Sequence, residues 1–272
     1  MLMLTKVYVI SLKRAPERRS SITKQLESLG LDFEMIDAVD YQELKDTDFE
    51  RLCDAQAVAQ QPFLTKGMRA CALSHVKALN KMIADGAPAA LILEDDAILP
   101  ADIKELLLTL GSELRKNEVI ALSYHSHRNE EICLSTQNSI ELGNERKLMF
   151  PIDVTYMAST MAYMVSLPVA QKMVSVMMPI SELPDSWGGY FRKGAFQAFR
   201  CVYPVVVKPA PFRSTLDHIG TKTLKSAISS LIRRYKLPFF NTLLEKRSQK
   251  LVEEKYAYRF TNRPPQSLRM SY

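Results

Sequence analysis

Short apolar runs alternate with amphipathic stretches over roughly the first 210 residues of the chain. Residues 7–12 form a nearly continuous, β-rich apolar run, which is typical of a strand buried on both faces. A helix is predicted from Pro16 to Gly30, because apolar residues recur between them at helical spacing and glycine favours a helix end. A second strand follows at residues 33–36. This strand–helix–strand opening indicates an α/β fold.

The same alternation continues towards residue 207. It predicts helices at residues 68–85, 103–114 and 168–177, and strands at residues 89–93, 119–122, 162–166 and, last, 202–207. Residues 40–66 and 125–155 show no clear period and receive no assignment. We therefore expect a mixed, mainly parallel sheet flanked by helices.

The composition places the chain among globular proteins. It has 272 residues, of which 47% are hydrophobic and 24% charged, and this excludes a disordered chain, a collagen-like chain and a small disulfide scaffold. No apolar run approaches the roughly 18 residues that a membrane-spanning helix needs. Lys6 interrupts the first apolar stretch, so we expect a strand there rather than a signal peptide. The four cysteines are far apart without a CxxC pair, which suggests neither zinc nor disulfides and favours a reducing, cytoplasmic setting.

Charge divides the chain into two parts. Residues 221–272 carry 12 Lys+Arg against 3 Asp+Glu, a net +9, whereas residues 1–220 carry 24 against 27, a net −3. We expect a domain at residues 1–220 and a basic, mainly helical extension at residues 221–272. Apolar residues recur at helical spacing between Leu224 and Leu251, accompanied by Lys and Arg, which predicts peripheral contact with an anionic membrane. A helical pair packed on the domain is the alternative.

Three carboxylates, Glu94, Asp95 and Asp96, directly follow the apolar residues 91–93. Ligands of open α/β sheets bind beyond the carboxyl ends of strands. Alternation along an extended backbone would point Glu94 and Asp96 together and Asp95 the opposite way. Clustered carboxylates are unfavourable without a cation or hydrogen-bond donors, and oxygen ligands suit Mg²⁺ or Mn²⁺. An acidic loop facing water is the other interpretation.

Several blocks in order resemble glycosyltransferase family 25, which includes bacterial lipooligosaccharide galactosyltransferases and collagen galactosyltransferase domains. The matching blocks are VYVISL at residues 7–12 with Arg14, Glu17, Arg18 and Arg19, then residues 36–40, GMRACALSH at residues 67–75, LILEDDAIL at residues 91–99, residues 160–166 and Asp185. Two features depart from the family pattern. Met68 replaces an acidic residue, and a glycine of the later block is missing, which affects substrate specificity more than membership.

The resemblance implies a GT-A-like nucleotide-binding fold and an inverting, metal-dependent transfer of a hexose. UDP-galactose is the donor it implies most readily, with a saccharide of lipooligosaccharide or lipopolysaccharide as acceptor. The residues expected to contact the nucleotide sugar are Ser11, Arg18, Ala38, Asp40, His75, Glu94 and Asp95. Mn²⁺ or Mg²⁺ is expected at Glu94 and Asp96, completed by His218, for which an ordinary loop histidine is the alternative. Asp185 is expected on the acceptor side and is the candidate general base, with Asp96 as the other catalytic residue.

Some residues keep two interpretations. Periodicity places His75 on an apolar helix face, where a structural histidine is as reasonable as a site residue. Trp187 could stack on a sugar beside Gly188 and Gly189 or belong to the core. His125 and His127 could form a metal pair or lie in an ordinary loop.

Two other functions remain open. Nucleotidyl or phosphoryl transfer could use the same carboxylates, but the chain has no GxxxxGK[ST] or GxGxxG motif. Nucleic-acid binding by the basic extension is less well supported, because aromatic and basic residues do not alternate regularly there. We therefore expect no nucleic-acid partner, and we expect a cytoplasmic location, peripheral on the inner membrane where the extension binds it.

Overall fold

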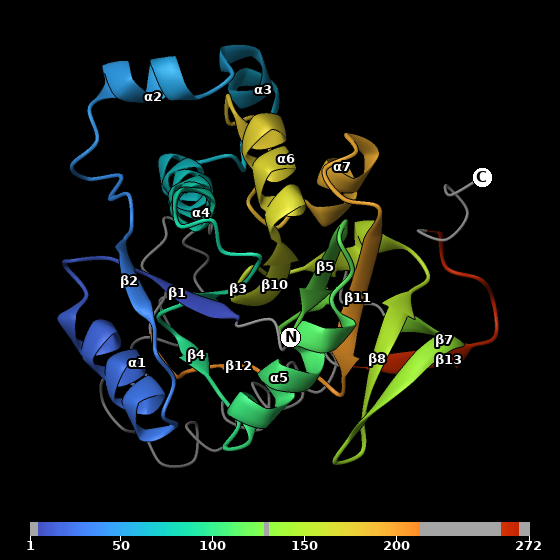
Figure 1. Ribbon diagram of the computed structural model, residues 1–272. Helices are drawn as coiled ribbons and strands as arrows, with labels where there is room; N and C mark the ends of the chain where they lie inside the picture. The colour runs from blue at the N-terminus through green and yellow to red at the C-terminus, as the bar shows by residue number, and fades with distance from the viewer. Residues whose placement is uncertain (1–4, 128–130, 213–256, 267–272) are drawn as a thin grey trace, which may run out of the picture.

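The computed structural model describes residues 5–127, 131–212 and 257–266. These residues form a nine-stranded sheet in the order β13-β7-β8-β11-β5-β10-β3-β1-β2 (Figure 1). Seven of the nine described strands run in one direction, and only β10 and β8 run the opposite way. The sheet is therefore mixed and mainly parallel, as the alternating pattern predicts, and it is consistent with a GT-A-like architecture.

The elements fall close to the predicted ranges. The strands of the large sheet are β1 (Lys6–Ser11), β2 (Glu34–Asp37), β3 (Ala89–Glu94), β5 (Glu118–Ala121), β7 (Ile132–Gly143), β8 (Arg146–Pro151), β10 (Ala162–Ser166), β11 (Ala198–Tyr203) and β13 (Tyr258–Thr261). The helices are α1 (Pro16–Ser28), α2 (Asp46–Leu52), α3 (Ala55–Gln60), α4 (Lys66–Ala84), α5 (Ile103–Glu113), α6 (Leu167–Met177), α7 (Trp187–Arg192) and the short 3₁₀ helix η1 (Val154–Tyr156). Two small sheets pair β4 (Ala97–Ile98) with β12 (Lys208–Pro209) and β6 (His125–Ser126) with β9 (Met157–Ala158).

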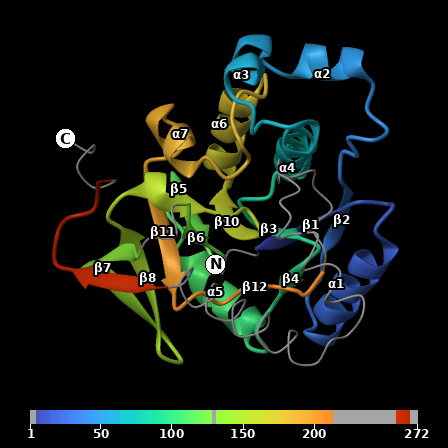
Figure 2. The same ribbon diagram turned by 180° about the vertical axis from the view of Figure 1, so that it is seen from behind.

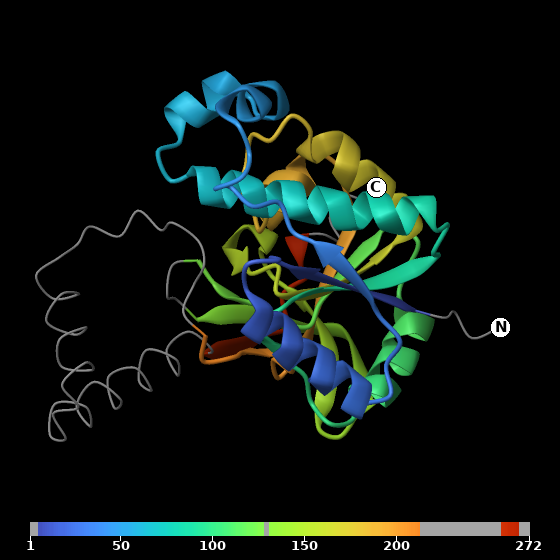
Figure 3. The ribbon, with the colours of Figure 1, turned by 90° about the vertical axis from the view of Figure 1, so that its left-hand side faces the viewer.

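Helices cover both faces of the sheet. In Figure 3, α4 and α6 lie on one side of the strands and α1 lies on the other. Alternate residues of each central strand contribute to different cores, so Tyr8 and Ile10 pack with α4, whereas Val7 and Val9 pack with α1 and α5. Because β1, β3, β5 and β10 are buried on both faces, they read as continuous apolar runs in the sequence.

The structure differs from the sequence analysis in three places. The strand predicted at residues 202–207 lies at Ala198–Tyr203. It begins earlier because Arg200, which is polar in the sequence, is buried in the strand and paired with Glu118. Residues 40–66, which received no assignment, contain α2 and α3. Residues 258–261 of the predicted helical extension form a strand that pairs in parallel with β7, at the edge of the sheet seen in Figures 1 and 2. Residues 221–256 and 267–272 of the predicted extension lie outside the described residues.

Among the described residues, none of the helices is both long and apolar enough to cross a membrane. All four cysteines lie in the described ranges and are free.

Candidate active site

A cleft lies at the carboxyl ends of β1, β2 and β3, beneath the first half of α4. Its lining includes seven residues that the sequence singles out, namely Ser11, Arg18, Ala38, His75, Glu94, Asp95 and Asp96. They converge because β1 lies between β2 and β3 and runs parallel to both, so the three strands end at the same edge. Ser11 is the last residue of β1 and Glu94 is the last residue of β3. The cleft is thus where open α/β sheets place ligands.

Arg18 joins two of the three carboxylates. Its Nη2 lies 2.5 Å from Asp95 Oδ1 and 2.8 Å from Asp96 Oδ2. Ser11 Oγ donates a hydrogen bond of 2.7 Å to the other oxygen of Asp95. Strict alternation, with Asp95 opposed to Glu94 and Asp96, is therefore wrong. The strand ends at Glu94, and the two aspartates lie in the turn that follows, where extended-chain geometry no longer applies.

Glu94 faces a different set of partners. Thr160 Oγ1 donates a 2.8 Å hydrogen bond to Glu94 Oε1, and His75 Nε2 lies 3.4 Å from the same oxygen. His75 Nδ1 is 3.0 Å from the hydroxyl of Tyr163, and the His75 side chain is only 1% exposed. His75 thus satisfies both interpretations, because it is buried in the core and also borders the cleft.

Burial and like charge disfavour ionisation of the aspartates. Burial, followed by the negative charge of Glu94, raises the pKa of Asp96 to about 6, although Arg18 acts in the opposite direction. Burial likewise raises the pKa of Asp95. Asp96 Oδ1 is buried and finds no hydrogen-bond partner in the part of the chain that the structure describes. A carboxylate oxygen left in this state fits a divalent cation, so Glu94 and Asp96 suit the Mg²⁺ or Mn²⁺ that the sequence predicts.

Asp185 does not line this cleft. Its Oδ2 accepts a 3.1 Å hydrogen bond from the backbone N–H of Ser159. Trp187 Nε1 donates to the carbonyl oxygen of Ser159 at 3.0 Å, and Ser159 has a φ of 92°, which non-glycine residues rarely adopt. Such backbone conformations persist only where neighbours hold them, and they cluster at functional sites. Thr160, the next residue, binds Glu94, so Asp185 is connected to the cleft through two adjacent residues.

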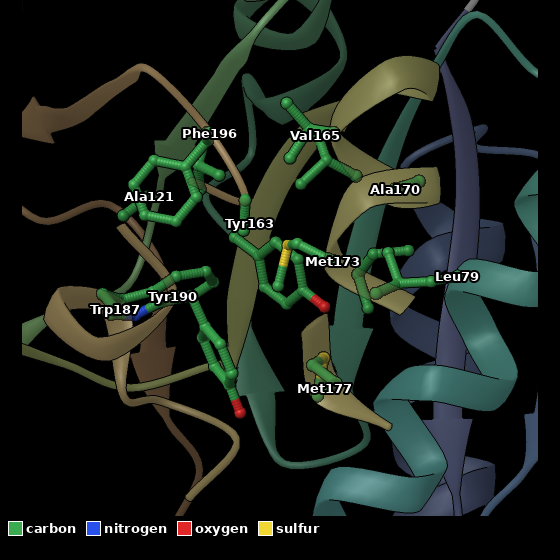
Figure 4. Packing of buried hydrophobic residues seen from close by; sticks show 14 of the residues in the cluster. Leu79, Ala121, Tyr163, Val165, Ala170, Met173, Met177, Trp187, Tyr190 and Phe196 are labelled. Carbon is green, nitrogen blue, oxygen red and sulfur yellow. The ribbon is translucent and has the colours of Figure 1, made fainter. Parts of the chain in front are cut away.

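Trp187 belongs to the core. It is fully buried, with its ring centroid 5.2 Å from that of Tyr163 and 5.3 Å from that of Phe199, as part of the packing in Figure 4. The interpretation of Trp187 as a sugar-stacking face is wrong. Gly188 and Gly189 are likewise buried in helix α7 and do not form an open loop that could approach an acceptor.

The other predicted residues are placed as follows. Ala38 lines the cleft and its N–H bonds to the carbonyl of Ser11 at 2.9 Å. Asp40 lies outside the lining and forms an ion pair with Arg14. His125 lies in β6, and His127 borders a second pocket. The described residues do not bring these two histidines into a group that could hold a metal. His218 lies outside the described residues.

Sequence reasoning missed several contributors to the cleft. Tyr41, Cys71 and Ser74 line it, and Thr160 and Tyr163 supply the partners of Glu94 and His75. Cys71 could have been found, because it lies four residues before His75 and so on the same helix face. Thr160 and Tyr163 could not, because only the pairing of β10 with β3 brings them beside Glu94 and His75.

Comparison with known proteins agrees with this architecture. The family model described as glycosyltransferase family 25 (LPS biosynthesis protein) matches residues 4–186. A glycosyltransferase 25 family member of Aedes aegypti is 24% identical over 272 residues, covering 92% of this chain and 41% of the relative. Inactive glycosyltransferase 25 family member 3 of Mus musculus is 26% identical, covering 79% and 38%. Procollagen galactosyltransferase 2 of Mus musculus is 25% identical, covering 65% and 29%. The chain thus spans about two-fifths or less of the length of these relatives.

Proposed function

This chain belongs to glycosyltransferase family 25, and from this premise we propose that it transfers a hexose from a UDP-sugar to a saccharide hydroxyl with inversion. Galactose is the proposed hexose, in keeping with the relative named as a procollagen galactosyltransferase. The proposed acceptor is a saccharide of lipooligosaccharide or lipopolysaccharide. Because some relatives are named inactive, family membership alone does not carry the proposal of activity.

The observation that carries it is the carboxylate cluster at the strand ends. Glu94, Asp95 and Asp96 all border the cleft, and Asp96 keeps one buried oxygen without a hydrogen-bond partner among the described residues. Burying several carboxylates together is unfavourable unless a cation or hydrogen-bond donors compensate their charge. A divalent cation bound by Glu94 and Asp96 would neutralise the diphosphate of the departing UDP.

The remaining lining supports a nucleotide. Arg18 holds the turn after β3 through Asp95 and Asp96, and its guanidinium borders the cleft, where it suits a diphosphate. Ser11 and Ala38 lie at the ends of neighbouring strands, within the cleft where the nucleoside would bind. Asp40 does not line the cleft but forms an ion pair with Arg14. Arg14 lies 5.7 Å from the centre of the Tyr41 ring, and Tyr41 lines the cleft, so Asp40 would act on the nucleotide through these two residues. His75 borders the cleft beside Glu94, with its Nε2 3.4 Å from a Glu94 oxygen.

Inversion requires in-line attack by the acceptor hydroxyl on the anomeric carbon, through a transition state with oxocarbenium character. A carboxylate must remove the hydroxyl proton, and we assign this role to Asp185. Asp185 is close enough to the cleft to affect a residue that lines it, Cys71. Burial, followed by the negative charges of Glu94, Asp185 and Asp96, raises the pKa of the Cys71 thiol well above its usual value. The backbone N–H of Ser159 holds the Asp185 carboxylate in place.

The proposed setting is the cytoplasmic face of a membrane that carries the acceptor. The basic segment at residues 221–272 would contact anionic lipid there, with each Lys or Arg contributing about 1 kcal/mol near the surface. An enzyme bound to the same membrane as a lipid-anchored acceptor would then meet that acceptor at the membrane surface.

UDP release from a panel of UDP-sugars, measured with Mn²⁺ and with or without saccharide acceptors, tests the function. We expect acceptor-dependent release, and we expect Asp96→Asn to lower it at least about 100-fold, since cation stabilisation is worth several kcal/mol. Asp32→Asn, an exposed aspartate outside the cleft, is the matched control and should leave release unchanged.

Three results would contradict the proposal. The first is no release by the folded chain with any donor. The second is full activity of Asp96→Asn in excess chelator. The third is formation of UMP or pyrophosphate in place of UDP, which would favour nucleotidyl or phosphoryl transfer.

A further inference from the structure

Cys71, His75 and Glu94 form a cluster of three different donor types at the floor of the cleft. Cys71 and His75 are four residues apart in α4, so they lie one turn apart on the same helix face, and Glu94 ends β3 beneath them. The cysteine sulfur, a histidine ring nitrogen and a glutamate oxygen all lie within 4.8 Å of one another. Within the described ranges, this is the only group of three or more His, Cys, Asp or Glu side chains arranged in this way.

The buried imidazole points to a ligand in the cluster. His75 is 1% exposed, and its Nδ1 contacts the Tyr163 hydroxyl, which can fix both the tautomer and the ring orientation. Nε2 finds no hydrogen-bond partner among the described residues and lies 3.4 Å from a Glu94 oxygen. With the proton on Nδ1, a nitrogen lone pair faces a carboxylate at that distance. A cation between the two groups stabilises this tautomer, whereas with the proton on Nε2 the imidazole donates to Glu94 instead.

The donor set selects the cation. One sulfur, one imidazole nitrogen and one carboxylate oxygen are the ligand types that zinc takes, whereas Mg²⁺ and Mn²⁺ prefer oxygen alone. We propose that Cys71, His75 and Glu94 bind Zn²⁺, in a site that differs in its ligands from the oxygen-only site at Glu94 and Asp96. Zn²⁺ binding at this site does not depend on the transferase activity.

The cluster needs little rearrangement to hold the ion. Ligand atoms about 2.0–2.3 Å from a tetrahedral zinc lie about 3.3–3.8 Å from one another, so no two of the three donors must approach by more than about 1.5 Å. All three residues line the cleft, so a fourth ligand would come from the cleft side. Binding exchanges the thiol proton of Cys71 for a sulfur–zinc bond, and that one proton passes to solvent. The imidazole binds in its neutral form.

Glu94 belongs to both ligand sets. A cation bound through Cys71 and His75 therefore draws Glu94 away from Asp96, and the two sites cannot both be filled without sharing this carboxylate. We expect Zn²⁺ to weaken Mn²⁺ binding for this reason.

Titration of the full chain with Co²⁺, followed by absorbance, is the direct test. A thiolate ligand gives a sulfur-to-cobalt charge-transfer band in the near ultraviolet, and Zn²⁺ should displace the Co²⁺ in a 1:1 ratio. Cys71→Ser should abolish the band, and His75→Gln should weaken Zn²⁺ binding at least tenfold. Cys133→Ser, a half-buried cysteine of β7 outside the cluster, is the matched control and should retain the band.

A second measurement uses the wild-type chain and does not depend on the folding of a variant. Saturating Zn²⁺ should slow alkylation of Cys71 at least tenfold, measured peptide by peptide with mass spectrometry, and should leave Cys133 unaffected. The site is rejected if Cys71 is alkylated equally fast with and without Zn²⁺. It is also rejected if Cys71→Ser keeps the cobalt band while Cys133→Ser loses it.

Discussion

Asp185 and Glu94 are joined through Ser159 and Thr160, which are adjacent in the chain. Asp185 accepts a hydrogen bond from the Ser159 N–H, and Thr160 donates one to Glu94. The left-handed φ of Ser159 lets one short segment face both carboxylates. The two carboxylates are thus bonded to the same short segment without direct contact between them.

Asp185→Asn tests the general-base role at this scale. The amide preserves shape and can still accept from Ser159, but it cannot take a proton, so we expect kcat to fall by about 10²–10⁴ while donor affinity changes little. Steady-state kinetics and equilibrium UDP-sugar binding give the two quantities separately. Unchanged kcat would remove Asp185 from this role, and a loss confined to donor affinity would make it a nucleotide-positioning residue.

Arg200 and Glu118 form an ion pair in which both side chains are fully buried. Arg200 Nη2 lies 2.6 Å from Glu118 Oε2 and donates to the carbonyl of Glu113 at 2.7 Å. Removing one partner of such a pair leaves an uncompensated buried charge, whereas an exposed pair contributes little.

Glu118→Gln should therefore destabilise the fold by about 3–5 kcal/mol. The matched control is Glu141→Gln, which breaks the exposed pair with Lys147 and should cost no more than about 1 kcal/mol. Urea unfolding of both variants gives the comparison. Equal losses in the two variants would mean that the burial of this pair has no energetic consequence.

At the scale of elements, helix α7 packs unusually close to the 3₁₀ helix η1. A Cβ added to Gly188 would lie 2.7 Å from the Thr155 Cα, a backbone atom that cannot move aside alone. This close approach seats Trp187 among the aromatic side chains of the core (Figure 4). Gly188 is therefore required by packing and not by loop flexibility.

Gly188→Ala should destabilise the protein by about 1–3 kcal/mol, because overpacking forces backbone shifts. Arg192→Ala, at an exposed position of the same helix, should change stability by about 0.5 kcal/mol or less. Thermal unfolding followed by Trp187 fluorescence measures both. A neutral Gly188→Ala would show that α7 can move away from η1 freely.

For the whole molecule, β13 ties the chain beyond residue 256 to the body. Residues 258–261 pair with β7, and Tyr203 lies against Tyr258 and Phe260 with ring centroids 4.9 and 5.0 Å apart. A chain that ends at Gly220 would lose this strand and leave β7 as an open edge. Truncation is therefore an unsuitable test of membrane binding by the basic extension.

Charge removal is the better test. Replacing Lys222, Lys225, Arg233, Arg234 and Lys236 by Gln should sharply reduce co-sedimentation with anionic vesicles at low salt, because these charges supply the attraction. The control variant replaces five exposed charges of the body, at Lys24, Lys45, Lys116, Lys172 and Arg192. Equal sedimentation of both variants, or none by the unmodified chain, would rule out a lipid-binding role for the extension.

The sequence by itself determined the βαβ opening, most helices and the position of the carboxylates at a strand end. These features depend on hydrophobic periodicity and on Pro16 and Gly30, which act over a few neighbouring residues. Part of the candidate cleft followed, because β1 and β2 are the parallel strands of one βαβ unit and end at the same edge. Ser11 and Ala38 lie at that edge for this reason, and Arg18 lies in the helix that joins the two strands, whereas the pairing of β3 with β1 is a long-range contact.

Only the tertiary structure decided which distant segments meet. β10 lies antiparallel between β3 and β5 and brings Thr160 and Tyr163 to Glu94 and His75, and nothing in the local pattern specifies that neighbour. The turn after Glu94 brings both aspartates to Arg18, which strict strand alternation does not predict. Periodicity reports which side of an element is buried, whereas strand pairing and ion pairing depend on groups far apart in the chain, whose contacts form only when the whole sheet assembles.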